Sequence, residues 1–257
     1  MIKRIFAAAV LAVAATSASA TTVTRDYSDA WNTTNESGWG LGVVQQGSII
    51  FATLYVQGQD SAPIWYVGSN LVHQGGGIFS GELFRITGSY FGGPFNQANT
   101  VATQVGTMVF TGTGVNSATL TYSVNGVVVN KTLSRLSFRT ENIAGQYVGA
   151  TVGAFSGCGS GNGPFESNAS YTVTQTESGA ATIFEFGSNY TCTYQGSYVQ
   201  TGRYGTLTGT GQCSNQPGVQ QTFNATELLV SPEGLTARLD SGVSTCRFNG
   251  RFGGVRR

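Results

Sequence analysis

Apolar and polar residues alternate along the chain in short runs that are separated by turn residues. A period of two is typical of β-strands, and no window beyond residues 1–20 shows a clear helical period. In the first half, the predicted strands are residues 40–45, 49–56, 64–67, 106–111, 118–124 and 127–133. In the second half, they are residues 169–176, 182–186, 192–198, 206–213, 220–230, 235–239 and 245–252. The pattern predicts an all-β protein.

Two short segments between these runs are typical of turns. Asn125-Gly126 separates two runs, and this dipeptide is a strong hairpin signal because a type I′ turn needs positive φ at both central positions. Asp240-Ser241-Gly242 also lies between two predicted strands and is interpreted as a turn. Both segments indicate antiparallel pairing of neighbouring strands.

Each half of the chain offers roughly six to eight short strands, which suits a small antiparallel barrel or sandwich. We therefore expect two barrel-like domains, over residues 21–140 and 145–257, joined by a short polar segment. The strands should be shorter than the about 9–11 residues of a membrane-spanning strand. Composition agrees, because 37 of the 257 residues are glycine, and glycine permits the bends of strands that close into a barrel.

The first residues resemble an export signal. Lys3 and Arg4 precede an alanine-rich apolar stretch, and a small-residue cleavage site of the A-x-A kind ends at Ala20. We expect residues 1–20 to be a signal peptide that is cleaved after Ala20. The mature protein is then secreted or periplasmic.

Charge and hydropathy exclude two classes of interaction for the remaining chain. No later stretch is long and apolar enough for a transmembrane helix. Removal of Lys3 and Arg4 with the leader leaves 11 basic and 12 acidic groups, which changes the net charge from +1 to −1. Binding to nucleic acid requires clustered Lys and Arg. We therefore predict no nucleic-acid partner.

Four cysteines, all in the second half, indicate two disulfides in an exported chain, for which three connectivities exist. Cys192 and Cys213 lie opposite each other if the two predicted strands that they border form a symmetric hairpin. This leaves Cys158 to pair with Cys246. Zinc is the alternative, but no C-x-x-C pair occurs and the single histidine is distant in sequence. We predict neither a metal nor another cofactor.

The chain lacks the short motifs of the common hydrolases. No G-x-S-x-G, H-E-x-x-H or P-loop pattern is present, and His73, the single histidine, is expected in a solvated loop. We assign no catalytic residue and favour a non-enzymatic role. The alternative is a hydrolase in which two carboxylates among Glu36, Asp60 and Glu82 meet in space.

Aromatic residues of the first half are the candidates for ligand binding. Trp39, Trp65 and Tyr66 fall on adjacent predicted strands, and flat aromatic faces stack on sugar rings. Trp65 and Tyr66 are neighbours in a strand, so one should point inward and the other outward. Glu36 and Trp39 are expected at a barrel mouth, where Trp39 either binds a ligand or closes the barrel end.

A set of motifs in the first half is shared with a known family. The motifs are Trp31-Asn32, Asn35-Glu36-Ser37-Gly38-Trp39-Gly40-Leu41, Gln45-Gln46-Gly47 and Pro63-Ile64-Trp65-Tyr66. With them, residues 31–138 resemble the ESGWGLN-type domain, a secreted bacterial module, and depart from it at Gly42, where the family more often has Asn. Related modules occur alone or attached to extracellular hydrolases. The resemblance implies an exported accessory protein of a Gram-negative bacterium and transfers no catalytic residue.

These observations predict an exported, non-catalytic binding or cell-surface accessory protein. Its expected partner is a glycan or another polymer of the cell envelope, which aromatic side chains would recognise. Two alternatives remain, namely a carboxylate-dependent extracellular hydrolase and an inhibitor of a secreted hydrolase.

Overall fold

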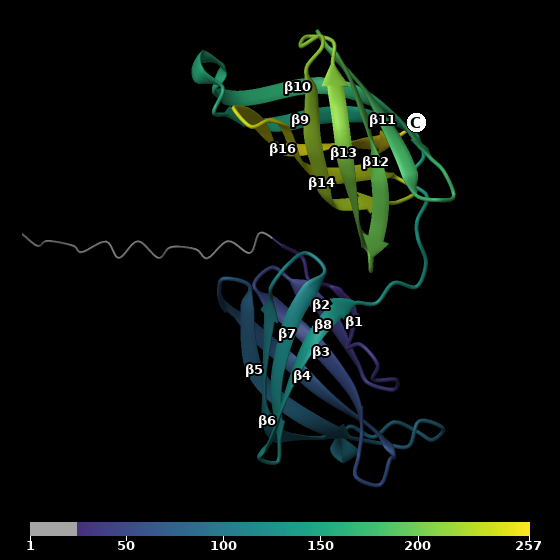
Figure 1. The fold of residues 1–257 in the computed structure, drawn as a ribbon. Coiled ribbons are helices and arrows are strands. Elements are labelled where there is room, and N and C mark those ends of the chain that lie inside the picture. The colour runs from purple at the N-terminus through teal and green to yellow at the C-terminus, as the bar shows by residue number, and fades with distance from the viewer. Residues whose placement is uncertain (1–24) are drawn as a thin grey trace, which may run out of the picture.

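The structure is a computed structural model that describes residues 25–257, and the predicted signal peptide lies outside these residues. Within them the chain forms two closed antiparallel barrels of eight strands each (Figure 1). The strands of the first barrel are β1 (Asp29–Asn32), β2 (Gly40–Gln46), β3 (Ile49–Gln57), β4 (Pro63–Gly75), β5 (Ile78–Thr87), β6 (Val101–Gly112), β7 (Ser117–Val124) and β8 (Val127–Arg135). Those of the second are β9 (Gly145–Ser156), β10 (Gly163–Gln175), β11 (Ala180–Gly187), β12 (Thr191–Thr201), β13 (Tyr204–Cys213), β14 (Gln220–Val230), β15 (Gly234–Val243) and β16 (Cys246–Arg256). The predicted all-β fold with two barrels is confirmed.

Both barrels are simple meanders, in which each strand pairs with the strands before and after it. The first barrel closes by pairing of β1 with β8, and the second by pairing of β16 with β9. Closure leaves no unpaired sheet edge. The interior of an eight-stranded barrel is just wide enough to be filled by side chains or to hold one small ligand. The inward-facing residues decide between these two outcomes.

Apolar side chains fill most of the interior of each barrel. In the first barrel, the rings of Trp31 and Phe110 pack edge to face with centroids 5.4 Å apart. In the second barrel, Tyr171 and Phe252 lie at the same centroid distance of 5.4 Å. Polar side chains such as Thr222 on β14 point outward and are exposed. This alternation accounts for the period of two in the sequence.

Two local predictions are wrong. The strands are longer than expected, since β4 and β10 contain 13 residues each, and residues 64–67 are only the beginning of β4. Asp240-Ser241-Gly242 lies within β15 and not in a turn, because its backbone pairs with β16. In a closed barrel each strand is hydrogen-bonded to a neighbour on both sides. This pairing extends strands through polar residues and glycines, where the sequence pattern alone predicts a turn.

Two disulfides confirm the predicted pairing, and both lie in the second barrel. Cys192 and Cys213 face each other across β12 and β13, with Cα atoms 4.1 Å apart. Cys158, beside the short 3₁₀ helix η2 (Gly159–Gly161), is bonded to Cys246 at the start of β16. Such bonds are typical of proteins in oxidising compartments outside the cytosol. None of the helices in the described part of the chain is long and apolar enough to span a membrane.

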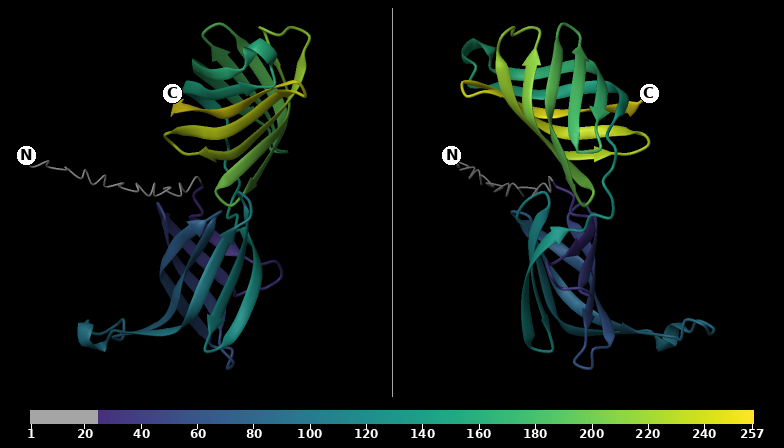
Figure 2. Two further views of the ribbon diagram at one scale, coloured as in Figure 1. Left: turned by 90° about the vertical axis from the view of Figure 1, so that its left-hand side faces the viewer. Right: turned by 45° about the vertical axis from the view of Figure 1, so that its right-hand side comes forward.

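The turn between β12 and β13 joins the second barrel to the first (Figure 2). The guanidinium of Arg203 donates to Asp26 Oδ2 at 3.0 Å, and its backbone N–H donates to Asp29 Oδ2 at 3.0 Å. Gly202 in the same turn has a φ of +62°, and a Cβ there would lie 2.4 Å from the Cβ of Arg135. Only glycine allows this close approach of the two barrels.

Arg135, the last residue of β8, is buried at this junction. Its guanidinium donates hydrogen bonds to four oxygen atoms, which are those of Val115 O (2.8 Å), Asp26 O (2.8 Å), Ser28 O (3.1 Å) and Asp29 Oδ2 (3.0 Å). The same group lies 4.7 Å from the ring centroid of Trp31 and 4.8 Å from that of Tyr204. Burial lowers the pKa of Arg135, and the Asp29 carboxylate opposes this shift. Arginine nevertheless stays charged, so a paired cation lies between the barrels.

The connection between β5 and β6 extends away from the first barrel as a separate arm (Figure 2). It contains the short 3₁₀ helix η1 (Gln97–Asn99) and exposes the rings of Tyr90, Phe91 and Phe95. No charged residue occurs over residues 86–100. The arm therefore adds an exposed aromatic segment outside the core of the first barrel.

Candidate functional site

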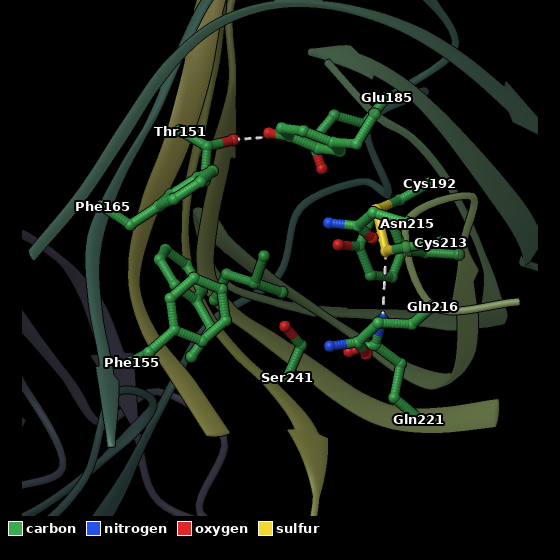
Figure 3. Close-up of a pocket in the computed structure, with 14 residues that line it drawn as sticks. Thr151, Phe155, Phe165, Glu185, Cys192, Cys213, Asn215, Gln216, Gln221 and Ser241 are labelled. Carbon is green, nitrogen blue, oxygen red and sulfur yellow. Dashed lines mark hydrogen bonds between the residues drawn. A yellow bond between two sulfur atoms is a disulfide. The ribbon is translucent and has the colours of Figure 1, made fainter. Parts of the chain in front are cut away.

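A cavity with a volume of about 120 Å³ opens at one end of the second barrel (Figure 3). Each of the eight strands of this barrel contributes at least one side chain to its lining. β12 begins at this end with Thr191 and reaches the junction with the first barrel only after Thr201, so the cavity lies at the end remote from the junction. The disulfide between Cys192 and Cys213 borders the cavity, and strands rather than mobile loops form most of its wall.

Glu185 of β11 is the one acidic residue in the wall of the cavity. Its side chain points into the barrel, and the residue is only 3% exposed. Thr151 Oγ1 donates to Glu185 Oε1 at 2.5 Å, and Tyr190 OH donates to the same oxygen at 2.9 Å. Tyr194 also lies within hydrogen-bond reach of this carboxylate, and within residues 25–257 no Lys or Arg pairs with it. The carboxylate therefore has hydroxyl donors but no counter-ion.

The burial of this carboxylate costs free energy, because it removes water from a charged group. The penalty for a buried ion is several kcal/mol unless a partner compensates it. The hydroxyl donors Thr151 and Tyr190 offset part of this penalty through charge-assisted hydrogen bonds. No cation of the described residues offsets the rest. The site thus has the chemistry to bind a group that carries hydrogen-bond donors or positive charge.

Three tyrosines surround Glu185 and remain protonated well into the alkaline range. Burial, and then the neighbouring carboxylate, raise the pKa of Tyr190 to about 12. Burial also raises the pKa of Tyr194 and Tyr171, with smaller contributions from Glu185. Tyr171 OH lies 3.0 Å from Thr151 Oγ1, which extends the hydrogen-bond network. These phenols are therefore neutral groups that can donate hydrogen bonds.

Aromatic rings form the wall of the cavity beside this network. Phe155 lies 5.4 Å from Phe165 and 5.3 Å from Phe248, measured between ring centroids. Gly153 and Gly250 face each other across β9 and β16, and a Cβ on either would come within 2.7 Å of the Phe248 ring. The two glycines therefore give this ring its place in the barrel interior. The result is an apolar wall with π-faces close to a buried carboxylate.

Polar side chains complete the lining near the disulfide. Gln221 donates from Nε2 to Cys213 Sγ at 3.1 Å, and the buried Ser241 lies between Gln221 and Phe155 in the view of Figure 3. Asn215 and Gln216 belong to the exposed connection between β13 and β14 and also line the cavity. A ligand would therefore meet a polar rim before it reached Glu185.

The tyrosine network predicts a specific response to alkaline pH. In the native protein Tyr171, Tyr190 and Tyr194 should stay protonated at about pH 10–11, where tyrosines of an unfolded chain ionise. Because their folded-state pKa values are raised, the stability that they contribute is complete below about pH 10 and is lost as the pH rises toward 12. Phenolate absorbance, recorded against pH with and without denaturant, measures the ionisation of the tyrosines in the two states. Urea unfolding at about pH 8 and about pH 11 measures the loss of stability. Ionisation of every tyrosine in one step, at the same pH in both states, would contradict the arrangement.

The residues that the sequence singled out lie in the first barrel. Glu36, in the connection between β1 and β2, is exposed and forms an ion pair with Lys131 at 2.5 Å. Trp39 is half-buried against the core of the first barrel, and its Nε1 donates to Tyr122 OH at 3.5 Å. This packing agrees with the alternative in which Trp39 closes the barrel end. A ligand-binding role of Glu36 and Trp39 stays a prediction.

Trp65 and Tyr66 point to opposite sides of β4, as expected. Tyr66 is 8% exposed and belongs to the core, whereas Trp65 is 45% exposed. Trp65 pairs with Tyr55 of β3, and both rings lie on the outer wall, where Phe51 is exposed as well. The four predicted site residues therefore divide between two faces: the backbone N–H of Trp39 donates to Glu36 O at 3.3 Å, whereas Tyr66 faces the core and Trp65 the outer wall.

The other candidate groups of the first barrel are also dispersed. His73 is partly buried, with its ring 5.0 Å from that of Phe79, so the expected solvated loop is wrong. Glu82 is exposed on β5, and Asp60 accepts a hydrogen bond from the N–H of Ala62 within its own turn. Among residues 25–257, no hydrogen bond joins any two of Glu36, Asp60 and Glu82.

The sequence analysis did not identify Glu185 or the residues around it. No protein-family model matches the chain, and no curated protein shows a significant match. The one signal in the sequence was the position of Glu185 in a predicted strand, two residues after Ile183 and therefore on the same face. The candidate site rests on its geometry.

Proposed function

We propose that the protein is an exported, non-catalytic binding protein that holds a small ligand in the cavity of its second barrel. The observation that carries this proposal is Glu185, a buried carboxylate on the wall of an open cavity with which no Lys or Arg of the described residues pairs. Buried charges are normally paired, and small-molecule sites are largely apolar pockets with a few convergent polar groups. Both features meet at this end of the barrel.

The architecture supports binding rather than turnover. Eight-stranded barrels can hold one small ligand in their interior, and residues of paired strands form most of the cavity wall here. Two disulfides at the same end, between Cys192 and Cys213 and between Cys158 and Cys246, restrain these walls further. A prepared site of this kind loses little conformational freedom on binding.

Export is part of the same proposal. The disulfides fit the periplasm or the exterior of the cell, and the predicted leader with cleavage after Ala20 would direct the chain there. The resemblance of residues 31–138 to the ESGWGLN-type module supports an accessory protein of a Gram-negative bacterium. The first barrel would then carry a second role, for which its outer wall is the candidate.

A second candidate function concerns that outer wall. Trp65 and Tyr55 are cross-strand neighbours and expose 45% and 54% of their surface, respectively. Adjacent exposed aromatic rings can stack on sugar rings, so this wall supports the expected recognition of a glycan of the cell envelope.

Closure of the cavity mouth tests the first proposal. Gln216→Trp places an indole at the exposed rim without changing the barrel interior, and Asn168→Trp on the outer face of β10 is the matched control. Thermal shift with aliphatic amines, aliphatic alcohols and monosaccharides should raise the Tm of the parent and of the control for at least one probe set, but not that of Gln216→Trp. Ligand binding to the native state raises stability by mass action.

Two results would contradict the proposal. One is the absence of any response from the parent, and the other is a response that Gln216→Trp retains in full. A response to monosaccharides that survives in Gln216→Trp and disappears in Trp65→Ala would assign binding to the outer wall.

A further inference from the structure

We propose that the cavity of the second barrel takes a small organic cation, whose ammonium group binds between Glu185 and the surrounding aromatic rings. This inference rests on the proposed function and adds the chemical class of the ligand. It follows from four features of the site, namely charge, hydrogen-bonding capacity, aromatic faces and volume.

The charge of the site favours a cation. Glu185 is 3% exposed, and no Lys or Arg within residues 25–257 pairs with it. The other buried acid of this barrel differs, because Glu227 accepts hydrogen bonds from Arg238 and Arg251, both at 2.8 Å. A buried charge without a counter-ion is costly. A cationic ligand would supply the partner that the chain provides for Glu227 but not for Glu185.

The hydrogen bonds of Glu185 point to a donor on the ligand. Thr151 and Tyr190 both donate to Oε1, and Tyr194 also lies within hydrogen-bond reach of the carboxylate. A carboxylate can accept about four hydrogen bonds, so an ammonium N–H could donate to Glu185 without displacing these partners. A carboxylate or phosphate ligand would instead place a second acceptor beside Glu185, which is unfavourable in a buried site.

The aromatic wall supplies the second half of the site. Phe155, Phe165 and Phe248 have mutual centroid distances of 5.3–5.8 Å, and the ring of Tyr190 lies 5.9 Å from that of Phe165. Aromatic faces attract cations, most strongly where water is excluded. Methyl or methylene groups of the ligand would pack against the same rings. A neutral, strongly hydrated polyol would lose its water here without an equivalent gain.

The volume limits the group that enters. The cavity measures about 120 Å³, on a scale where one water molecule needs about 10–15 Å³. This is room for a head group of a few heavy atoms, such as a methylated or branched ammonium. The mouth is bordered by the exposed residues Asn215 and Gln216, through which the rest of a longer ligand could extend. The inferred class is therefore an alkylammonium or a related amine.

The first test compares probes of equal shape and different charge on the unmodified protein. Isobutylammonium, isobutanol and isobutyrate are titrated by calorimetry, and tetramethylammonium tests whether an N–H is needed. We expect isobutylammonium to bind at least about tenfold more tightly than isobutanol, because a charge-assisted hydrogen bond is stronger than a neutral one, and we expect isobutyrate not to bind. Equal affinity for isobutanol and isobutylammonium would overturn the inference while leaving a small-ligand cavity in place.

The second test changes the carboxylate. Glu185→Gln keeps the size of the side chain and removes its charge, and Glu166→Gln, which is exposed on the outside of β10, is the matched control. Affinity for isobutylammonium should fall by about tenfold or more in Glu185→Gln and stay unchanged in Glu166→Gln. Full affinity in a folded Glu185→Gln protein would overturn the inference. If this variant fails to fold, the comparison of probes on the parent still decides. Failure of every probe to bind, in calorimetry and in thermal shift, would overturn the proposed function as well.

Discussion

Replacement of Arg135 by Met should lower the free energy of unfolding of the first barrel by about 3–5 kcal/mol, the usual cost of removing one member of a buried ion pair. The substitution keeps an unbranched side chain of similar length. It removes the hydrogen bonds that Arg135 donates to the Asp29 carboxylate and to the carbonyls of Ser28 and Val115. It also removes the cation that lies 4.8 Å from the Tyr204 ring of the second barrel.

Two further variants show whether the buried pair causes the loss. Arg139→Met is the matched control, because the Arg139 side chain is 77% exposed and its partner Glu141 is also partly exposed. Surface pairs of this kind contribute little, so we expect no measurable change. Asp29→Asn combined with Arg135→Met should recover part of the stability, since it removes the charge of a carboxylate that has lost its ion-pair partner. Calorimetry measures the Tm of both barrels, and an Arg135→Met protein as stable as the parent would contradict this account of the junction.

Removal of the Cys158–Cys246 disulfide should destabilise the second barrel by about 4–5 kcal/mol, the largest effect that we expect from any single bond in the chain. The bond joins residues 88 positions apart, whereas Cys192 and Cys213 are 21 positions apart. Removal of a disulfide increases the chain entropy of the unfolded state, and this increase is larger for a longer loop. For the shorter loop between Cys192 and Cys213, the expected loss of stability is about 3 kcal/mol. The substituted pairs are Cys158→Ser with Cys246→Ser, and Cys192→Ala with Cys213→Ala.

Urea unfolding of the two double variants measures both losses. The longer loop should give the larger decrease, and the first barrel should unfold at an unchanged urea concentration because it contains neither bond. An equal stability of the parent and the Cys158/Cys246 variant, or the reverse order of the two losses, would contradict the expectation. The comparison also shows how much each disulfide stabilises the end of the second barrel that holds the cavity.

Much of the fold could be predicted because the geometry of an antiparallel barrel produces regular patterns in the sequence. Alternation of inward and outward residues located most strands, and Asn125-Gly126 marked the turn between β7 and β8. The hairpin register placed Cys192 opposite Cys213. These features are local, and local spacing determines them. Strand lengths were underestimated, because pairing on both sides continues strands through glycine and polar residues.

The candidate site was not predicted, and the reason lies in β11. Phe184 and Phe186 alternate with Ile183 and Glu185, so apolar content alone favours the two phenylalanines as the inward residues. In the structure the phenylalanines are 38% and 49% exposed, and Ile183 and Glu185 are both 3% exposed. A shift of one residue exchanges the two faces of a strand. Only the pairing with β10 and β12 decides which face is inside.

The aromatic residues chosen from the sequence do not line the cavity. Trp65 and Trp39 are conspicuous in composition, but one lies on the outer wall of the first barrel and the other against its core. Tyr190 and Phe165, which line the cavity, stand in a connection and near the start of a strand that the sequence pattern did not extend so far. Closure of the barrel places Phe165 beside Tyr190 and beside Phe248 of β16, and pairing over such a long range leaves no local pattern in the sequence.

The most direct test of a ligand site in the second barrel is a crystal structure of the protein with isobutylammonium at a saturating concentration. The account predicts the ligand in the cavity, with its nitrogen within hydrogen-bond distance of the Glu185 carboxylate and its methyl groups against Phe155 and Phe248. An empty cavity, or the ligand bound only on the outer wall beside Trp65, would contradict it.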